Sequence, residues 1–195
     1  MKRFLVIYAT ILLLSFATIA QEHSGRPSRP APTTPSAPPR TTPPAAAPVG
    51  WVKFISEEGG FSVLMPGTPK ETIETSQSDH GPYTTHIVLL RQEDNVYMVG
   101  WVDYDPSFNF NRQAELEANR DNFVNGIKAT LLETRTTTIN GYPAIEFSAE
   151  NANRIFKSRV YIVGRRPYQI VIGSPKEIDD SANINRFFSS FKLTP

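Results

Sequence analysis

Histidine is the side chain best suited to metal binding and to proton transfer near neutral pH, and the sequence contains three. His80 and His86 lie six residues apart with Asp79 beside the first, so a turn and the strand after it could bring both imidazoles together. His23 lies far from them in a proline-rich stretch, and no H-E-x-x-H spacing occurs. We therefore expect no metal site, with His80 exposed in a turn and His86 facing solvent from a strand.

Carboxylates and hydroxyls offer a second route to catalysis. Asp103 and Asp105 flank the end of a predicted strand, where they could hold calcium or act as acid and base, but no EF-hand pattern occurs and we expect a solvated strand end. No G-x-S-x-G elbow occurs, and Pro175 follows Ser174 where that turn needs a free amide. A triad can assemble from distant positions, so a hydrolase with dispersed residues such as Asp103, Asp105 and His86 stays open. No Gly-rich phosphate loop or dinucleotide fingerprint occurs, and we expect no cofactor.

Basic residues gather around the last predicted hairpin: Arg154, Lys157, Arg159, Arg165 and Arg166. We expect Glu146 to face Lys157 or its neighbour across the ladder, in an ion pair of about 0.2–1 kcal/mol. Arg165 and Arg166 lie at the tip of the hairpin, where the sequence offers no partner, so we expect both to point to solvent. They are candidate binding residues for an acidic protein or an anionic envelope polymer; the alternative is a role in solubility alone.

Aromatic residues along one predicted strand are the other candidates for binding a partner. Trp101 and Tyr104, with Tyr97 nearby, could line a groove for a ligand. Packing in the core is the commoner fate of such side chains, and it is the alternative here.

The first 20 residues have the composition of a secretory signal peptide. Met1-Lys2-Arg3 carries positive charge, an apolar run extends from Phe4 to about Ala17, and Ala20 precedes a predicted cleavage before Gln21. The alternative is a retained anchor, although the run is shorter than the roughly 20 apolar residues that span a membrane. Export predicts that the rest of the chain works in the periplasm or outside the cell.

Residues 21–49 are predicted to be a disordered linker. Nine prolines lie between Arg26 and Pro48 among serine, threonine and alanine, with no large apolar residue. Proline lacks an amide donor and fixes φ, so this stretch favours polyproline II, a semi-rigid spacer of about 3 Å per residue.

Residues 50–195 have the pattern of a single α+β domain. Strands are predicted at Trp51–Ile55, Phe61–Met65, Glu71–Ser76, Tyr83–Arg91, Val96–Tyr104, Leu132–Ile139, Ala144–Ala149, Ile155–Val163 and Tyr168–Gly173. Asn140-Gly141 predicts a two-residue hairpin turn. Because short turns join most neighbours, we expect a mainly antiparallel sheet of about six or more strands.

Two main helices are expected to flank this sheet. Helical spacing of apolar residues predicts the first helix from Arg112 to about Thr130. The second is expected to begin at Ser174 as its cap, with Pro175 in the first turn. Its predicted buried stripe consists of Ile184, Phe187, Phe188 and Phe191.

The composition excludes further classes of function. The chain contains no cysteine, which rules out thiol catalysis, thiolate zinc sites, iron–sulfur clusters and attachment through an acylated cysteine. From Gly50 onward there are 15 basic and 18 acidic residues, a net charge of −3. This domain lacks the basic surface typical of nucleic-acid binding, so we expect no nucleic acid partner.

Three segments of the domain carry a family resemblance. They are Gly59-Gly60-Phe61-Ser62-Val63 with Met65-Pro66-Gly67, then Ile139-Asn140-Gly141-Tyr142-Pro143-Ala144, and the closing Phe187-Phe188 and Phe191. These segments are similar to exported bacterial domains of the PsbP-like (Mog1p/PsbP-like) fold. The resemblance implies an α/β/α sandwich around an antiparallel sheet, in families whose members mostly lack catalysis. Some members of these families carry a lipid anchor on a cysteine. This chain has no cysteine and so departs from that pattern.

Two functional hypotheses follow. The favoured one is a non-catalytic exported domain that binds a protein or a cell-envelope component. The alternative is the extracytoplasmic hydrolase with a dispersed active site.

Overall fold

The computed structural model describes residues 50–78, 81–108 and 111–194 of the chain. The predicted signal peptide and linker, together with His23 and His80, lie outside the described residues. In chain order the elements are β1 Val52–Ser56, β2 Phe61–Met65, β3 Lys70–Ser78, β4 Gly81–Gln92, β5 Asn95–Tyr104, α2 Arg112–Gly126, β6 Thr130–Ile139, β7 Tyr142–Glu150, β8 Arg154–Val163, β9 Arg166–Pro175, α3 Ser181–Ser190 and β10 Lys192–Leu193.

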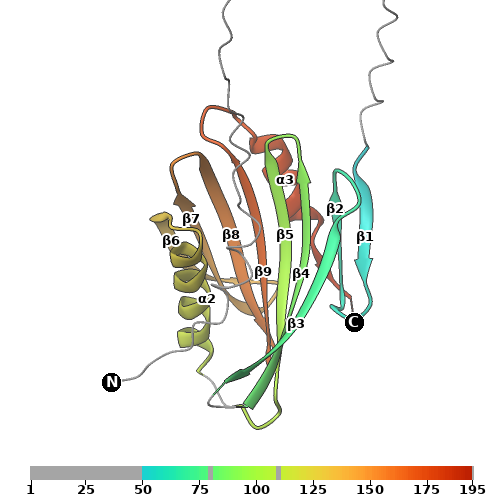
Figure 1. Ribbon diagram of the computed structural model, residues 1–195, viewed down its shortest axis with the longest axis vertical. Helices are drawn as coiled ribbons and strands as arrows, with labels where there is room; N and C mark the ends of the chain where they lie inside the picture. The colour runs from blue at the N-terminus through green and yellow to red at the C-terminus, as the bar shows by residue number, and fades with distance from the viewer. Residues whose placement is uncertain (1–49, 79–80, 109–110, 195) are drawn as a thin grey trace, which may run out of the picture.

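Seven strands form one antiparallel sheet in the order β3-β4-β5-β9-β8-β7-β6 (Figure 1). Near its middle β5 pairs with β9, so that Val99 lies opposite Ile170 and Trp101 opposite Tyr168. Both strands are buried along most of their length, because both faces of the sheet are covered there. The apolar residues on both faces of Val96–Tyr104 predict this position correctly.

The β6–β7 hairpin closes through the predicted two-residue turn. Asn140 and Gly141 have φ angles of 52° and 81°, the left-handed values that a type I′ turn requires at both positions. This turn sets the register in which Ile139 lies opposite Tyr142. That register places Glu133, Arg135 and Glu146, whereas Glu150 lies beyond a bulge between Leu131 and Glu133.

A second, three-stranded antiparallel sheet has the order β1-β2-β10. On β2, Ser62 lies opposite Ile55 of β1 and Lys192 of β10. The Thr194 amide then donates to the Gly60 carbonyl at 2.8 Å. The small sheet is therefore built from both ends of the described domain.

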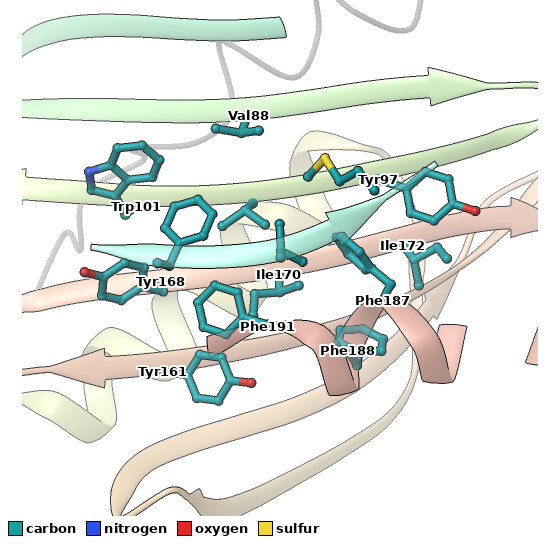
Figure 2. Packing of buried hydrophobic residues seen from close by; sticks show 14 of the residues in the cluster. Val88, Tyr97, Trp101, Tyr161, Tyr168, Ile170, Ile172, Phe187, Phe188 and Phe191 are labelled. Atoms are coloured by element: carbon teal, nitrogen blue, oxygen red, sulfur yellow. The ribbon is translucent and has the colours of Figure 1, made fainter. Parts of the chain in front are cut away.

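The two faces of the large sheet have different covers. Helix α2 packs on one face, where Leu116 and Phe123 lie against Phe147 and Phe156. Helix α3 and the small sheet pack on the other face. Figure 2 shows Phe187 and Phe188 reaching from α3 toward Ile172, with Phe191 beside Tyr161. Full burial of each such aromatic side chain contributes about 1.5–3 kcal/mol to folding.

The two helices differ at their ends from the predicted boundaries. Helix α2 ends at Gly126 rather than near Thr130, because Thr130 already pairs with Glu150 in the sheet. Helix α3 begins at Ser181, with Asp180 at its cap. The prediction that Ser174 caps this helix is wrong: Ser174 and its neighbour are the last residues of β9, where Ser174 pairs with Ile155.

The predicted fold class is confirmed: an α+β domain with a mainly antiparallel sheet flanked by two helices. The stripe of α3 is also confirmed, since Phe187, Phe188 and Phe191 are buried and Ile184 packs against them. Neither described helix has the length and apolar character that crossing a membrane requires.

Candidate functional site

A charged groove lies over β6, β7 and β8, beside α3. Its volume is about 580 Å³, and its lining consists of Glu133, Thr134, Arg135, Glu146, Phe147, Ser148, Lys157, Ser158, Arg159, Ile184, Asn185 and Phe188. Open grooves of this size with several converging polar groups are the usual places for ligands. We take it as the candidate binding site.

The strand register brings three of the charged residues into one row. Arg135 lies opposite Glu146, which lies opposite Arg159, so all three side chains emerge on the same face. Arg159 Nε contacts Glu146 Oε1 at 2.7 Å, and the Arg135 guanidinium donates to Oε2. The predicted cross-strand ion pair therefore forms with Arg159, the same-face neighbour of Lys157.

The net effect of these contacts is to keep Glu146 ionised. Burial alone would raise the pKa of its carboxyl group, but the hydrogen bond from Arg135 and the charges of Arg159 and Arg135 outweigh burial and lower that pKa. Two positive charges thus share one negative charge in this row.

Arg159 is also held by aromatic rings. Its guanidinium carbon lies 4.6 Å from the centre of the Phe188 ring, a cation–π contact that fixes the guanidinium plane against the wall formed by α3. Burial raises the pKa of the nearby Tyr161 hydroxyl, against the opposing effect of the Arg159 charge and hydrogen bond, so the phenol stays neutral.

Other polar groups of the groove are unused by the fold. Among the described residues, the side chains of Lys157, Glu133 and Asn185 make no hydrogen bond or ion pair, and all three residues are exposed. Lys157 lies opposite the small Ser148, which in turn lies opposite Glu133. Within the part of the chain that the structure describes, the groove therefore contains one cation, one carboxylate and one amide whose side chains are not paired with other polar groups.

A second polar cluster lies beneath the β1–β2 turn. Arg166 Nε contacts Asp103 Oδ1 at 2.6 Å, and the same guanidinium donates to the Glu58 carbonyl at 2.9 Å. The Tyr168 hydroxyl donates to the Gly59 carbonyl at 2.9 Å. These bonds fasten the turn of the small sheet to the strands of the large one.

His86 lies inside this cluster, which corrects the expectation that it faces solvent. It is 3% exposed, with Nε2 3.3 Å from Asp103 Oδ2 and Nδ1 3.7 Å from Glu58 Oε1. The turn over the imidazole and the indole of Trp101 behind it exclude water. The sequence could not reveal this cover, because the turn precedes His86 by a long stretch of chain.

The four predicted partner-binding residues lie in different surroundings. Trp101 is 1% exposed and packs edge to face on Phe61 at 5.5 Å between ring centres, which matches the core alternative. Tyr104 is half-buried, stacks on Phe108 at 4.4 Å and donates to the Glu115 carboxylate.

The expectation that the two arginines at the hairpin tip have no partner is wrong. Arg165 is exposed, but it donates to the carbonyl oxygens of Asp105, at 3.1 Å, and Phe108. Arg166 is half-buried in the cluster with Asp103. Both side chains therefore tie strand ends to the hairpin, a role that needs tertiary contacts which no local pattern shows.

The dispersed residues of the hydrolase hypothesis come together only in part. His86 and Asp103 meet, whereas Asp105 turns away and accepts hydrogen bonds from the Ser107 hydroxyl and amide, which lower the pKa of its carboxyl group. No group of three or more histidine or carboxylate side chains in the described part of the chain is arranged to hold a metal ion. Ser174 lies in a strand.

The groove is the feature that the sequence reasoning missed. Charged residues at alternate positions, Glu133 with Arg135 and Lys157 with Arg159, signal a solvated face on two strands. The sequence predicts Lys157 and Arg159 in a basic hairpin, with Glu146 facing Lys157 or its neighbour, and it predicts no groove there. That α3 forms a wall beside that face follows from the packing of Phe187 and Phe188, which is a tertiary property.

Comparison with known proteins bears on the fold. No protein-family model matches the sequence, and no curated protein matches it. The structure is similar to the solution structure of cyanobacterial PsbP (CyanoP) from Synechocystis sp. PCC 6803, with a TM-score of 0.51 and 10% sequence identity over 78% of this chain and 97% of that one. The fold is PsbP-like.

Two further solved structures are more distant from this PsbP-like domain. A protein of unknown function from Pseudomonas aeruginosa, described as a putative regulator, has a TM-score of 0.32 and 9% identity over 65% of this chain and 83% of that one. A crystal structure from Bacteroides thetaiotaomicron has a TM-score of 0.36 and 13% identity over 73% of this chain and 48% of that one. At these identities the likeness concerns the fold alone.

Proposed function

We propose that the chain is a non-catalytic domain that is exported and binds a protein or cell-envelope component through the groove over β6, β7 and β8. The observation that carries the proposal is the set of unused polar side chains in the groove, Lys157, Glu133 and Asn185, next to an arginine pair that shares one carboxylate. Their position inside a groove, next to the paired arginines, distinguishes them from the charged residues scattered elsewhere on the surface and supports a ligand.

Export is part of the same proposal. The basic start, apolar run and small-residue end of residues 1–20 support a signal peptide, and the proline-rich residues 21–49 support a spacer that holds the domain away from a membrane or wall. A domain of this size can be stable outside the cytoplasm without disulfides, because it buries an apolar core of its own.

One observation favours the alternative, a hydrolase with a dispersed site: His86 and Asp103 approach to 3.3 Å, as a base and its orienting carboxylate would. The surroundings favour a structural role instead. His86 stacks on Trp101 beneath the β1–β2 turn, and the second carboxylate oxygen of Asp103 is engaged by Arg166. A substrate would have to displace that turn to reach the imidazole.

The proposed function is tested by photo-crosslinking in intact cells. A benzophenone side chain replaces Asn185 in the groove, and a control variant carries it in place of Thr72, an exposed residue on β3. We expect an adduct of defined mass from the groove position and none from β3. Export is read in the same cells from the N-terminal residue of the recovered chain.

Two results would count against the proposal. Equal adduct patterns from Asn185 and Thr72 would mean that the groove is not a binding site. Hydrolysis of a chromogenic ester by the purified chain, abolished in His86→Ala while the fold is retained, would support the enzymatic alternative.

A further inference from the structure

The groove has more hydrogen-bond donors than acceptors. Each guanidinium carries five N–H donors, and Glu146 accepts one contact from Arg135 and one from Arg159. Lys157 adds three donors and has no acceptor among the described residues. The remaining carboxylate, Glu133, lies at the outer rim on the edge strand, and the Asn185 amide oxygen is an uncharged acceptor. The groove is therefore suited to a ligand that brings acceptors.

The donors are held in the geometry that carboxylates prefer. Arg159 is fixed by Glu146 on one side and by the Phe188 ring on the other, so little side-chain entropy is lost when it binds a second carboxylate. The side chain of Arg135 is 73% exposed, which leaves its unused N–H groups accessible from the open side of the groove.

The α3 side of the groove is partly apolar. Ile184 is half-buried there and Phe188, 8% exposed, lines the groove beneath the Arg159 guanidinium, with the exposed Asn185 between them in sequence. An anionic sugar or phosphate polymer has no side chain to place against this wall. An extended peptide does, because its successive side chains point to opposite sides.

We propose that the groove binds an extended acidic peptide in which carboxylate side chains alternate with apolar ones. The carboxylates contact Lys157 and the unused donors of Arg135 and Arg159, and the apolar side chains contact Ile184 and the small part of Phe188 that lines the groove. The inference rests on the proposed binding function and adds the chemistry of the partner.

The test measures fluorescence anisotropy of a fluorescein-labelled octapeptide of alternating glutamate and leucine, titrated with the exported chain at low ionic strength. Two further octapeptides replace glutamate by glutamine or leucine by serine. We expect binding of the glutamate–leucine peptide that weakens as salt is added, and weaker binding of both others.

The variant pair is Lys157→Glu and Lys70→Glu. Both lysines are exposed strand residues without a partner among the described residues, and Lys70 lies on β3 at the opposite edge of the same sheet. Reversing the charge in the groove should raise Kd about fivefold, and the same change on β3 should leave Kd unchanged. Matching thermal unfolding curves show that both variants fold.

Three results would overturn the inference. These are equal affinities for the glutamate and glutamine peptides, equal Kd values for the two variants, or binding of polygalacturonate at the groove with no binding of any peptide. The last result, together with an adduct at Asn185, would leave the proposed function standing with a polysaccharide as partner. Absence of the adduct would remove the proposed function itself.

Discussion

The imidazole of His86 lies flat against the indole of Trp101, with ring centres 4.5 Å apart and planes 5° apart. One residue comes from β4 and the other lies opposite it on β5. The β1–β2 turn packs over these stacked rings. Trp101 belongs to the aromatic core shown in Figure 2, and His86 contacts Asp103 in the polar cluster with Arg166.

Replacing His86 by alanine should lower the free energy of unfolding by about 2 kcal/mol, because the change removes the stack and leaves a space beneath the turn. Urea denaturation monitored by tryptophan fluorescence measures the loss. The control is Thr72→Ala, an exposed position on β3 that should change stability by less than about 0.5 kcal/mol. Equal stability of the two variants would contradict the structural role.

Arg166 and Arg165 are neighbours that should have separable effects. Arg166→Gln removes the bonds to Asp103 and to the Glu58 carbonyl, so amide hydrogen exchange at Gly59 and Gly60 should accelerate about tenfold. Arg165→Gln should instead accelerate exchange at the Asp105 and Phe108 amides, because Arg165 contacts the carbonyl oxygens of these two residues. If both variants loosened the same segment, the two arginines would not hold different parts of the fold.

Glu115 should make the domain less stable as pH rises, whereas a carboxylate in an ordinary ion pair makes a fold more stable as pH rises. Burial raises the pKa of this carboxyl group above 4.5, and the hydrogen bonds from Tyr104 and Asn119 offset burial only in part. The folded state therefore binds the proton of Glu115 more tightly than the unfolded state does. Glu115 stabilises the fold at low pH, and this stabilisation is lost as pH rises through the raised pKa. Glu115→Gln should thus gain stability relative to the parent above that pKa, measured by thermal unfolding from pH 4 to pH 8. A constant difference across this range would refute the assignment.

Glu146 should show the opposite behaviour. Its pKa is lowered by Arg135 and Arg159, so its ion pairs stabilise the fold above the ordinary value of 4.5 and are lost as pH falls through the lowered pKa. Glu146→Gln should cost about 0.5–1 kcal/mol at pH 7 and nothing once the parent carboxyl is protonated. Urea midpoints measured from pH 7 downward, with the ionisation of Glu146 followed by NMR at each pH, give the comparison. A cost that persists after the Glu146 carboxyl has taken up its proton would indicate loss of packing rather than of charge.

Most of the strands could be predicted, because the alternation of apolar residues and the turn residues that mark a strand lie within the strand itself or beside it. Val96–Tyr104 has apolar residues on both faces, and Asn140-Gly141 can adopt the left-handed angles of its turn, so both features can be inferred without knowing the fold. Ser174 misled because serine before proline is also a good helix start. Only the pairing of Ser174 with Ile155, which depends on the next strand, keeps it in the sheet.

The site was less predictable than the fold, since it depends on which distant segments meet. Nothing near His86 in the sequence shows that the Glu57–Gly60 turn covers it, and nothing near Arg159 shows that Phe188 lies beneath its guanidinium. Alternating charges indicated a solvated face, but the wall that makes this face a groove comes from α3. The spacing of apolar and charged residues indicates whether a segment is a helix or a strand, but it does not show which distant segments pack against it.

The small sheet also constrains when the domain can finish folding. Its central strand β2 lies near the start of the described domain, whereas its partner β10 consists of Lys192 and Leu193, far later in the chain. Phe191, which stacks on Phe61 at 5.4 Å, lies equally far along the chain. A nascent chain from which α3 and β10 have not yet emerged therefore lacks the pieces that complete its aromatic core, so the core can close only after those two elements have left the ribosome.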